Sequence, residues 1–210
     1  MRALTLHRHN RHRHQGFTLV ELLLVIVIIG ILLVVATPFI AGTMQANRLT
    51  LAGSTLTFKM SLAQQQAVSR KKPVELRFYS YTHQGQTGIR GYQLFVRTKE
   101  GPAGSEAVAI DSPEFFGDGE VIAPVSALSP IFTGEGESVT EEPFSNKTGV
   151  RLYKLVFYPD GSTNLDQSLG SSFMTLIVEG NSIPAGTTPP ANYYTIQIDP
   201  VTGRARSYRP

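Results

Sequence analysis

Cysteine is absent from this 210-residue chain, and its histidines are concentrated at one end. Without cysteine there is no disulfide framework and no thiol chemistry, so a folded domain must depend on its hydrophobic core. Four of the five histidines, His7, His9, His12 and His14, lie among the first 14 residues, and His83 stands alone. We therefore expect no histidine-based catalytic triad, no metal site and no cofactor.

Enzyme motifs are lacking as well. The sequence has no phosphate-binding loop, no dinucleotide fingerprint, no His-x-x-x-His pair and no serine nucleophile elbow. We predict that the protein is not an enzyme, and we assign no catalytic residue.

The formal net charge of +3 arises from the first 16 residues. They contain four arginines, Arg2, Arg8, Arg11 and Arg13, and no acid, so the rest of the chain has 15 Lys+Arg against 16 Asp+Glu. The alternating Arg/His tract could bind a metal, but a basic segment before an apolar run is typical of the cytoplasmic side of a membrane anchor. The basic composition is thus poor evidence for nucleic-acid binding.

No charged side chain occurs from Leu22 to Asn47, and about 20 apolar residues suffice to cross a bilayer. Glu21 stands at the start of this run, where a carboxylate costs up to about 2.5–3.5 kcal/mol at mid-bilayer. Such a residue is a functional hypothesis that needs a partner. If the chain is cut between Gly16 and Phe17, the new amine lies one helical turn from Glu21, and the amine of one subunit could neutralise Glu21 of the next.

The junction between the basic and apolar segments resembles the N-terminus of type IV prepilins and type II secretion pseudopilins; it is Gly16-Phe17-Thr18-Leu19-Val20-Glu21. The resemblance implies cleavage by prepilin peptidase after Gly16, N-methylation of Phe17, and a role for Glu21 in setting the register of assembly. Pro38 falls where that family commonly has a helix-kinking proline. Many exported pilins have a disulfide near the C-terminus, and this chain departs from them.

Two other interpretations of the N-terminus stay open. One is a plain signal anchor in which Glu21 is incidental. The other is a secretory signal peptide, whose apolar core is about 7–15 residues and ends at a small-residue cleavage site. The apolar run here is longer, and no good Ala-x-Ala site follows it.

Helical periodicity continues beyond Pro38, where apolar residues recur every three or four positions: Leu49, Ala52, Leu56, Met60, Ala63 and Ala67. We predict one helix from Phe17 to Lys71. Residues 17–37 would form its transmembrane or filament-core part and residues 38–72 an amphipathic continuation that packs on a globular domain. Cations followed by proline at Lys71-Lys72-Pro73 indicate its end.

Residues 74–79 alternate apolar and polar for most of their length and predict a strand. Further strand-like segments occur at 92–97, 150–158, 173–178 and 193–198, and a short last strand is expected near 204–208. The Gly/Gln-rich link at 84–88 predicts a hairpin between the first two. The expected fold class is α+β: a pilin-like protein whose long N-terminal helix packs on an antiparallel β-sheet domain formed by residues 73–210.

Residues 99–149 differ in composition from their surroundings. Ten acids and no Lys or Arg occur between Glu100 and Asn146. The short apolar pairs Val121-Ile122 and Ile131-Phe132 indicate brief strands or tucked loops, and the acids show no spacing suited to a Ca²⁺ site. We expect a solvated, variable insertion, with a partner-facing surface as the alternative.

The C-terminal half adds a weaker resemblance to the minor pseudopilin H and FimT group. It rests on Phe157-Tyr158-Pro159-Asp160-Gly161-Ser162 and Ile196-Gln197-Ile198-Asp199-Pro200-Val201-Thr202-Gly203-Arg204. That group has a β-sheet domain packed on the helix. Pilin-like proteins of Verrucomicrobial gene cassettes share this build and are the alternative.

The tail holds the one basic cluster outside the leader, with Arg204, Arg206, Tyr208 and Arg209. Arginines contact phosphate and a tyrosine can stack on a base, and FimT-like members implicated in DNA uptake have a similar tail. Charges on an edge strand also keep it soluble, and this explanation is preferred. Nucleic acid is therefore a conceivable partner but not the favoured one.

Together these features predict a minor pseudopilin, held in the bacterial inner membrane by one span with its C-terminal domain in the periplasm. Prepilin peptidase would remove the leader, residues 1–16, and the subunit would join other pseudopilins in a short periplasmic filament of a type II secretion system. The alternative is a FimT-like minor pilin of a type IV pilus or DNA-uptake system.

Overall fold

The computed structural model describes residues 17–99, 106–117, 119–123, 125–132, 134–139, 144, 147, 149–167, 172–179 and 188–210, without the side chains of 35–41 and 99. The chain divides into two compact units, residues 1–43 and 44–210. One helix, α1 (Leu19–Arg70), contributes to both. No helix within the described residues is long and apolar enough to cross a membrane.

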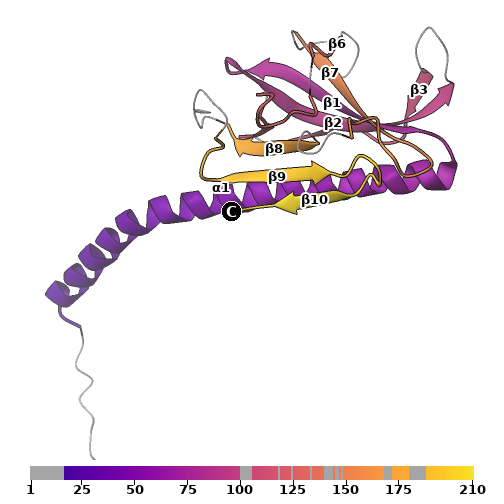
Figure 1. Ribbon diagram of the computed structural model, residues 1–210. Helices are drawn as coiled ribbons and strands as arrows, with labels where there is room; N and C mark the ends of the chain where they lie inside the picture. The colour runs from indigo at the N-terminus through magenta and orange to yellow at the C-terminus, as the bar shows by residue number, and fades with distance from the viewer. Residues whose placement is uncertain are drawn as a thin grey trace, which may run out of the picture. The chain divides into compact units, whose positions relative to one another are not determined.

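The second part of α1 packs on the sheet through the stripe expected from the sequence. Five of its six apolar residues are fully buried, and the sixth, Ala52, is partly buried against the same cluster. Figure 1 shows α1 running along one side of the β-strands. Since the stripe is continuous over five turns, burial of this face stabilises the helix far more than local propensity does.

The C-terminal end of α1 is closed by a left-handed residue that is not glycine. Lys71 has φ 53°, its N–H donates to the Val68 carbonyl at 3.4 Å, and the Lys72 N–H donates to the Ala67 carbonyl at 3.3 Å. These two bonds are those of a Schellman motif, which satisfies the last free carbonyls of a helix. Pro73 follows and cannot continue the helix.

Ten strands form one sheet in the order β10-β9-β8-β5-β2-β1-β7-β6, and β3 and β4 also pair with β2. Every pairing is antiparallel, so the predicted α+β class is confirmed. The strands are β1 Val74–His83, β2 Gln86–Lys99, β3 Glu106–Ala109, β4 Glu114–Phe115, β5 Glu120–Ile122, β6 Glu137–Ser138, β7 Arg151–Phe157, β8 Phe173–Val178, β9 Tyr193–Ile198 and β10 Ala205–Tyr208.

The first hairpin is longer and tighter than predicted. His83 of β1 pairs with Gln86 of β2, so the loop contains only Gln84 and Gly85, with φ of 49° and 80°. Two positive φ values are what a two-residue turn needs to match the twist of its strands. Side chains that alternate along β1 face the helix-side core or the opposite face of the sheet.

The 99–149 segment, expected to be a solvated insertion with brief strands or tucked loops, is only partly solvated where the structure describes it. This part supplies β3 to β6, and Ile122, Ala123, Leu128 and Phe144 are buried. The tucked-loop alternative holds for Ile131 and Phe132, which pack against the main core outside any strand.

The acids of this segment also bind the helix. Lys59 of α1, only 8% exposed, forms ion pairs with Asp111 at 2.8 Å and with Glu114. Burial lowers the pKa of Lys59, but the hydrogen bonds and charges of these two carboxylates outweigh it and raise the pKa. The Asp111 carboxylate also accepts the Leu94 backbone N–H at 2.9 Å. The acidic segment is therefore fastened to α1 and β2.

Candidate functional site

Thr18 and Glu21 satisfy each other's backbone groups at the first turn of α1. The Thr18 N–H and hydroxyl both donate to Glu21 Oε2, each at 3.2 Å, and the Glu21 N–H donates to Thr18 Oγ1 at 3.2 Å. This reciprocal arrangement is a capping box, in which an N-terminal Thr and a Glu three residues later occupy donors that the helix leaves free. Glu21 is thus held in one place before it meets any partner.

The capping box stabilises the helix end in two ways. A Thr cap contributes about 1 kcal/mol, and a carboxylate in the first turn interacts favourably with the positive end of the helix dipole. Sequence reasoning assigned Glu21 a role in register but missed Thr18 as its partner. The signal was present, since Thr-x-x-Glu before an apolar run is the sequence pattern of this cap.

Only one of the two Glu21 oxygens is used. Within the described part of the chain, Oε1 of Glu21 has no hydrogen-bond partner, and the side chain is solvent-exposed. Phe17, directly before the cap, is 79% exposed. A cation that approached this helix end would find a carboxylate oxygen that the helix does not need.

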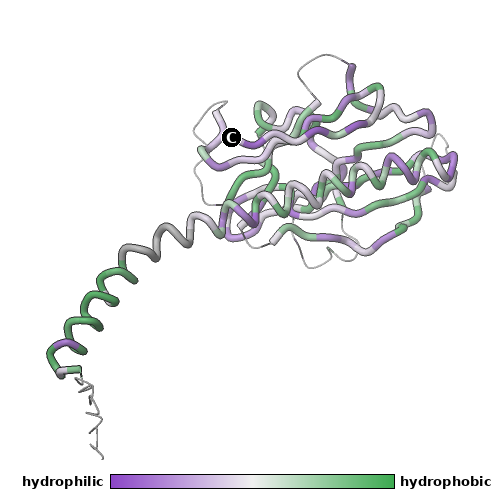
Figure 2. Tube along the Cα trace, turned by 90° about the horizontal axis from the view of Figure 1, so that it is seen from below, coloured by the Kyte–Doolittle hydropathy of each residue, from purple (hydrophilic) through white to green (hydrophobic). Residues whose placement is uncertain are grey.

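The apolar stretch after Glu21 is solvent-exposed. Every large hydrophobic residue from Leu19 to Val34 is between 45% and 82% exposed. Figure 2 shows this stretch as an almost continuous hydrophobic tube. An exposed apolar surface of this size marks an interaction site.

Two of the site residues predicted from the sequence cannot be located by their side chains in the structure. Gly16 lies before the first described residue, and the side chain of Pro38 is not described although α1 includes it. The cleavage site and the kink therefore stay predictions.

The predicted tail residues are not equivalent. Arg204, Arg206 and Tyr208 are exposed at the edge strand β10. Arg209 instead donates to Thr50 Oγ1 of α1 and, at 2.9 Å, to Asn192 Oδ1. The Arg209 guanidinium thus links the C-terminal end of the chain to α1. Figure 1 shows that β10 runs beside this helix.

The two turn sequences in the C-terminal half meet in space. The Thr163 N–H and hydroxyl donate to the Pro200 carbonyl at 2.8 and 3.1 Å. At Gly203, where φ is +64°, an added Cβ would lie 2.6 Å from the carbonyl oxygen of Gly161. Gln64 of α1 donates to the Thr202 carbonyl at the same place. The turn at residues 160–163 and the turn at residues 199–203 therefore contact each other directly, and the second of them is hydrogen-bonded to α1.

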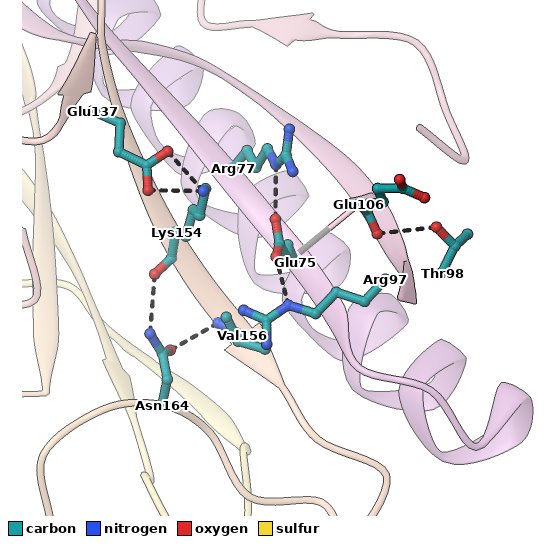
Figure 3. Close-up of polar contacts among 9 residues, drawn as sticks. All are labelled: Glu75, Arg77, Arg97, Thr98, Glu106, Glu137, Lys154, Val156 and Asn164. Carbon is teal, nitrogen blue, oxygen red and sulfur yellow. Dashed lines mark hydrogen bonds and ion pairs between the residues drawn. The ribbon is translucent and has the colours of Figure 1, made fainter. Parts of the chain in front are cut away.

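A charge cluster that sequence reasoning did not find lies on the face of β1 opposite the helix. The Glu75 carboxylate is fully buried and pairs with Arg77 Nε at 2.8 Å and Arg97 Nε at 2.6 Å (Figure 3). Arg77 also lies 3.9 Å from the centre of the Phe95 ring. The Glu75-x-Arg77 spacing within β1 does not by itself mark Glu75 as buried, because the second partner, Arg97, comes from β2. Its geometry indicates a structural ion network.

The comparison with protein families matches residues 11–37 to the family described as the prokaryotic N-terminal methylation motif. Neither a curated protein nor a solved structure matches the chain. Within the described residues, no group of three or more His, Cys, Asp or Glu side chains could hold a metal ion. The methylation motif implies processing by a prepilin peptidase and assembly with other pilin-like subunits. The chain therefore carries at residues 11–37 the N-terminal methylation motif of type IV pilin-like proteins and pseudopilins.

Proposed function

We propose that the protein is a non-catalytic minor pseudopilin of a type II secretion system. It is held by one span in the bacterial inner membrane with residues 44–210 in the periplasm, cut after Gly16, methylated at Phe17 and assembled into a short periplasmic filament. The observation that carries this proposal is Glu21 in the first turn of α1, held by Thr18 ahead of an uncharged apolar stretch whose large side chains from Leu22 to Val34 are 45–75% exposed.

Glu21 would set the stagger between neighbouring subunits. An unpaired carboxylate in an apolar bundle is costly, whereas one paired with an amine is satisfied. The free Oε1 of Glu21 can accept the methylated amine of Phe17 from the next subunit while Oε2 stays with Thr18. Only the stagger that brings the two together satisfies both charges, so that stagger is favoured.

DNA uptake by a FimT-like subunit is the second candidate. Arg206 and Tyr208 are exposed on β10, and Arg204 is exposed directly before it, which favours this candidate. Arg209, however, is engaged with Thr50 and Asn192. Hydrogen bonds from Thr202 and, more weakly, the charge of Arg206 lower the pKa of Asp199, so Arg206 already lies beside an anion. Fewer free cations remain than the sequence predicts, which weighs against DNA binding by the tail.

The intact mass of the protein extracted from membranes tests the processing step. The expected species begins at methylated Phe17 when the peptidase is active and at Met1 when it is deleted. A chain that begins at Met1 despite an active peptidase, or after residue 36, would contradict the proposal.

The role of Glu21 is tested by a pair of variants that separate its charge from its capping. Glu21→Gln keeps an oxygen that can cap Thr18 but removes the charge, and we expect it to insert in the membrane and to be nearly absent from filaments. Thr18→Ala removes the hydroxyl and keeps the charge, so it should assemble with a smaller defect. Filament incorporation is measured by shearing and immunoblotting. Equal incorporation of Glu21→Gln and Thr18→Ala would contradict the proposal.

Salt-dependent DNA binding by the full chain in detergent distinguishes the second candidate. If DNA is the ligand, the double variant Arg204→Ala with Arg206→Ala should lose most affinity and flatten the salt dependence. Lys72→Ala, an exposed cation at the far end of α1, is the control. Equal and weak binding by all three proteins would exclude a DNA function for the tail.

A further inference from the structure

The second part of α1 has a row of apolar side chains that the sheet does not cover. Three of them, Met44, Leu51 and Phe58, are 52%, 68% and 69% exposed and follow one another at intervals of seven residues. Each residue turns a helix by about 100°, so Leu51 and Phe58 lie nearly opposite the buried Leu49 and Leu56. The sheet therefore covers one apolar stripe of this helix and leaves a second one open.

This open stripe has the spacing of a coiled-coil seam. Its six positions alternate at intervals of four and three residues, and we call them the outer seam: Met44, Arg48, Leu51, Thr55, Phe58 and Leu62. All are exposed except Leu62, which is half-buried. Alternation of four and three is the pattern by which one helix packs along another, whereas a strand presents every second residue. The outer seam therefore fits a helix.

A groove of about 520 Å³ lies along the middle of the outer seam. Leu51 and Thr55 line it from α1, and Phe115 lines it from β4. Phe115 is 49% exposed, so an occupant of the groove would cover it together with Leu51. The groove also contains two carboxylates, Glu114 and Glu120. The period of the seam, and not the charge of the groove, consequently indicates the class of occupant.

Arg48 is the only charged residue of the outer seam. Among the described residues it has neither a hydrogen bond nor an ion pair, and its side chain is exposed. Glu21 is likewise the only charged residue from Leu19 to Val34, a helical stretch whose large apolar side chains are also exposed. Each of the two helix surfaces thus has one charge that lacks a counter-charge, and the two charges are opposite in sign.

The two surfaces also match in spacing. Arg48 follows Glu21 by 27 residues, and the same shift pairs the other positions in order: Met44 with Phe17, Leu51 with Leu24, Thr55 with Ile28, and Phe58 with Ile31. Other shifts set Glu21 against an uncharged position of the seam, where an unpaired carboxylate is costly. At 1.5 Å per residue, the shift corresponds to a stagger of about 40 Å along the helix axis.

We propose that the outer seam binds the first part of α1, Leu19–Val34, of a second copy of this chain, with Arg48 on Glu21 of that copy. The inference rests on the proposed function, because subunits that leave one membrane together have parallel helices. It adds the receiving surface and the stagger. Since a carboxylate accepts several hydrogen bonds, Glu21 can bind the Phe17 amine of one neighbour and Arg48 of another.

The test uses engineered cysteines, because the chain has none of its own. Two differently tagged full chains, Leu24→Cys and Leu51→Cys, are produced together in cells with an active peptidase, and the membranes are oxidised. A disulfide forms only where the two Cα atoms come within about 7 Å, so we expect a dimer that contains both tags. Leu24→Cys with Val68→Cys is the matched control. Val68 is 50% exposed but lies about 25 Å further along the helix, and this pair should give no dimer.

The ion pair is tested in the same cross-linking assay. Arg48→Gln in the Leu51→Cys chain should lower the yield of the dimer at least about threefold, in line with the loss of a partly exposed ion pair. Arg48→Lys should restore most of the yield. Arg204→Gln, which removes the same charge from an exposed site on the tail, should leave the yield unchanged. Equal thermal unfolding of these variants shows that the fold is intact.

Several outcomes would overturn the proposal. A dimer formed by Leu51→Cys alone would mean that the helices pair in register, and equal yields with Leu51→Cys and Val68→Cys would mean that contact is unspecific. Equal losses in Arg48→Gln and Arg204→Gln would remove the ion pair. A chain that is cut, present in sheared filaments and never cross-linked would refute the seam and leave the proposed function intact. A chain absent from filaments would refute both.

Discussion

The two parts of helix α1 are alike in backbone and opposite in surroundings. From Leu19 to Val34 all large apolar side chains are exposed, and the only charged residue of the stretch is Glu21. From Met44 to Arg70 one face is fully buried under the sheet, and the charged Lys59 is buried in ion pairs. A helix of this length therefore has two different sources of stability. The second part is stabilised by packing on the sheet, whereas the large apolar side chains of the first are exposed in the part of the chain that the structure describes.

The charged side chains of the two units also differ in burial and pairing. The Glu75 carboxylate of the second unit is fully buried and pairs with two arginines, whereas the Glu21 carboxylate of the first unit is exposed and, among the described residues, is bound by Thr18 alone. Removing a charge should consequently damage folding in one unit and assembly in the other.

The largest expected effect is at Glu75. Glu75→Gln removes the buried carboxylate with which Arg77 and Arg97 pair, and breaking a buried ion pair costs about 3–5 kcal/mol of unfolding free energy. Glu21→Gln should leave that free energy unchanged within about 0.5 kcal/mol. Urea unfolding of the full chain in detergent at pH 7 measures both. A similar loss in the two variants would remove the distinction between the units.

The contribution of Glu75 should also depend on pH. Burial raises the pKa of Glu75, but the hydrogen bonds from Arg97 and Arg77 outweigh it and hold the pKa below its ordinary value of 4.5. A depressed folded-state pKa means that the stabilisation is complete above pH 4.5 and is lost as the pH falls through the folded-state value. The gap between the wild type and Glu75→Gln should therefore shrink in acid.

The next largest difference is expected between leucines of the two helix parts, in the unfolding free energy that each loses on substitution by alanine. Leu56 is fully buried and Leu24 is 56% exposed. Leu56→Ala should cost about 2–5 kcal/mol, the range for buried leucines, and Leu24→Ala less than about 0.5 kcal/mol. If Leu24→Ala shifted thermal unfolding as much as Leu56→Ala, the first part of the helix would have an intramolecular partner after all.

The glycines of the helix give a sharper version of this comparison. A Cβ at Gly53 would overlap the Tyr194 ring of β9, whereas at Gly30 nothing lies within 4 Å. Gly53→Ala should destabilise the fold by about 1–3 kcal/mol, and the loss should largely disappear in a Tyr194→Ala background. Gly30→Ala should be neutral or slightly stabilising because alanine is the better helix former. Denaturant midpoints of the four variants test the prediction.

The smallest expected effect is an increase in the unfolding free energy. Lys71 occupies a left-handed conformation that costs a non-glycine residue about 1 kcal/mol. Lys71→Gly should therefore raise the unfolding free energy by up to about 1 kcal/mol. Lys72→Gly lies outside the left-handed position and should give no gain, so a similar rise in both would point to charge rather than conformation as the cause.

The sequence was sufficient wherever the signal was local. The predicted helix from Phe17 to Lys71 is observed from Leu19 to Arg70, and the strands predicted at 173–178 and 193–198 coincide with β8 and β9. The methylation motif, too, is a contiguous pattern that needs no partner elsewhere in the chain. Periodicity and caps depend on residues three or four apart, and these neighbours are visible in the sequence.

Only the tertiary structure decided what distant residues do to one another. It placed the acids of the 99–149 segment on Lys59, set Gly53 under Tyr194, joined the turns of Gly161 and Gly203, and tied Arg209 to α1. Composition made the acidic segment look solvated and the tail look free, because composition does not show which charges find a partner. Burial and pairing depend on contacts across the sheet and the helix, and folding alone brings these contacts together.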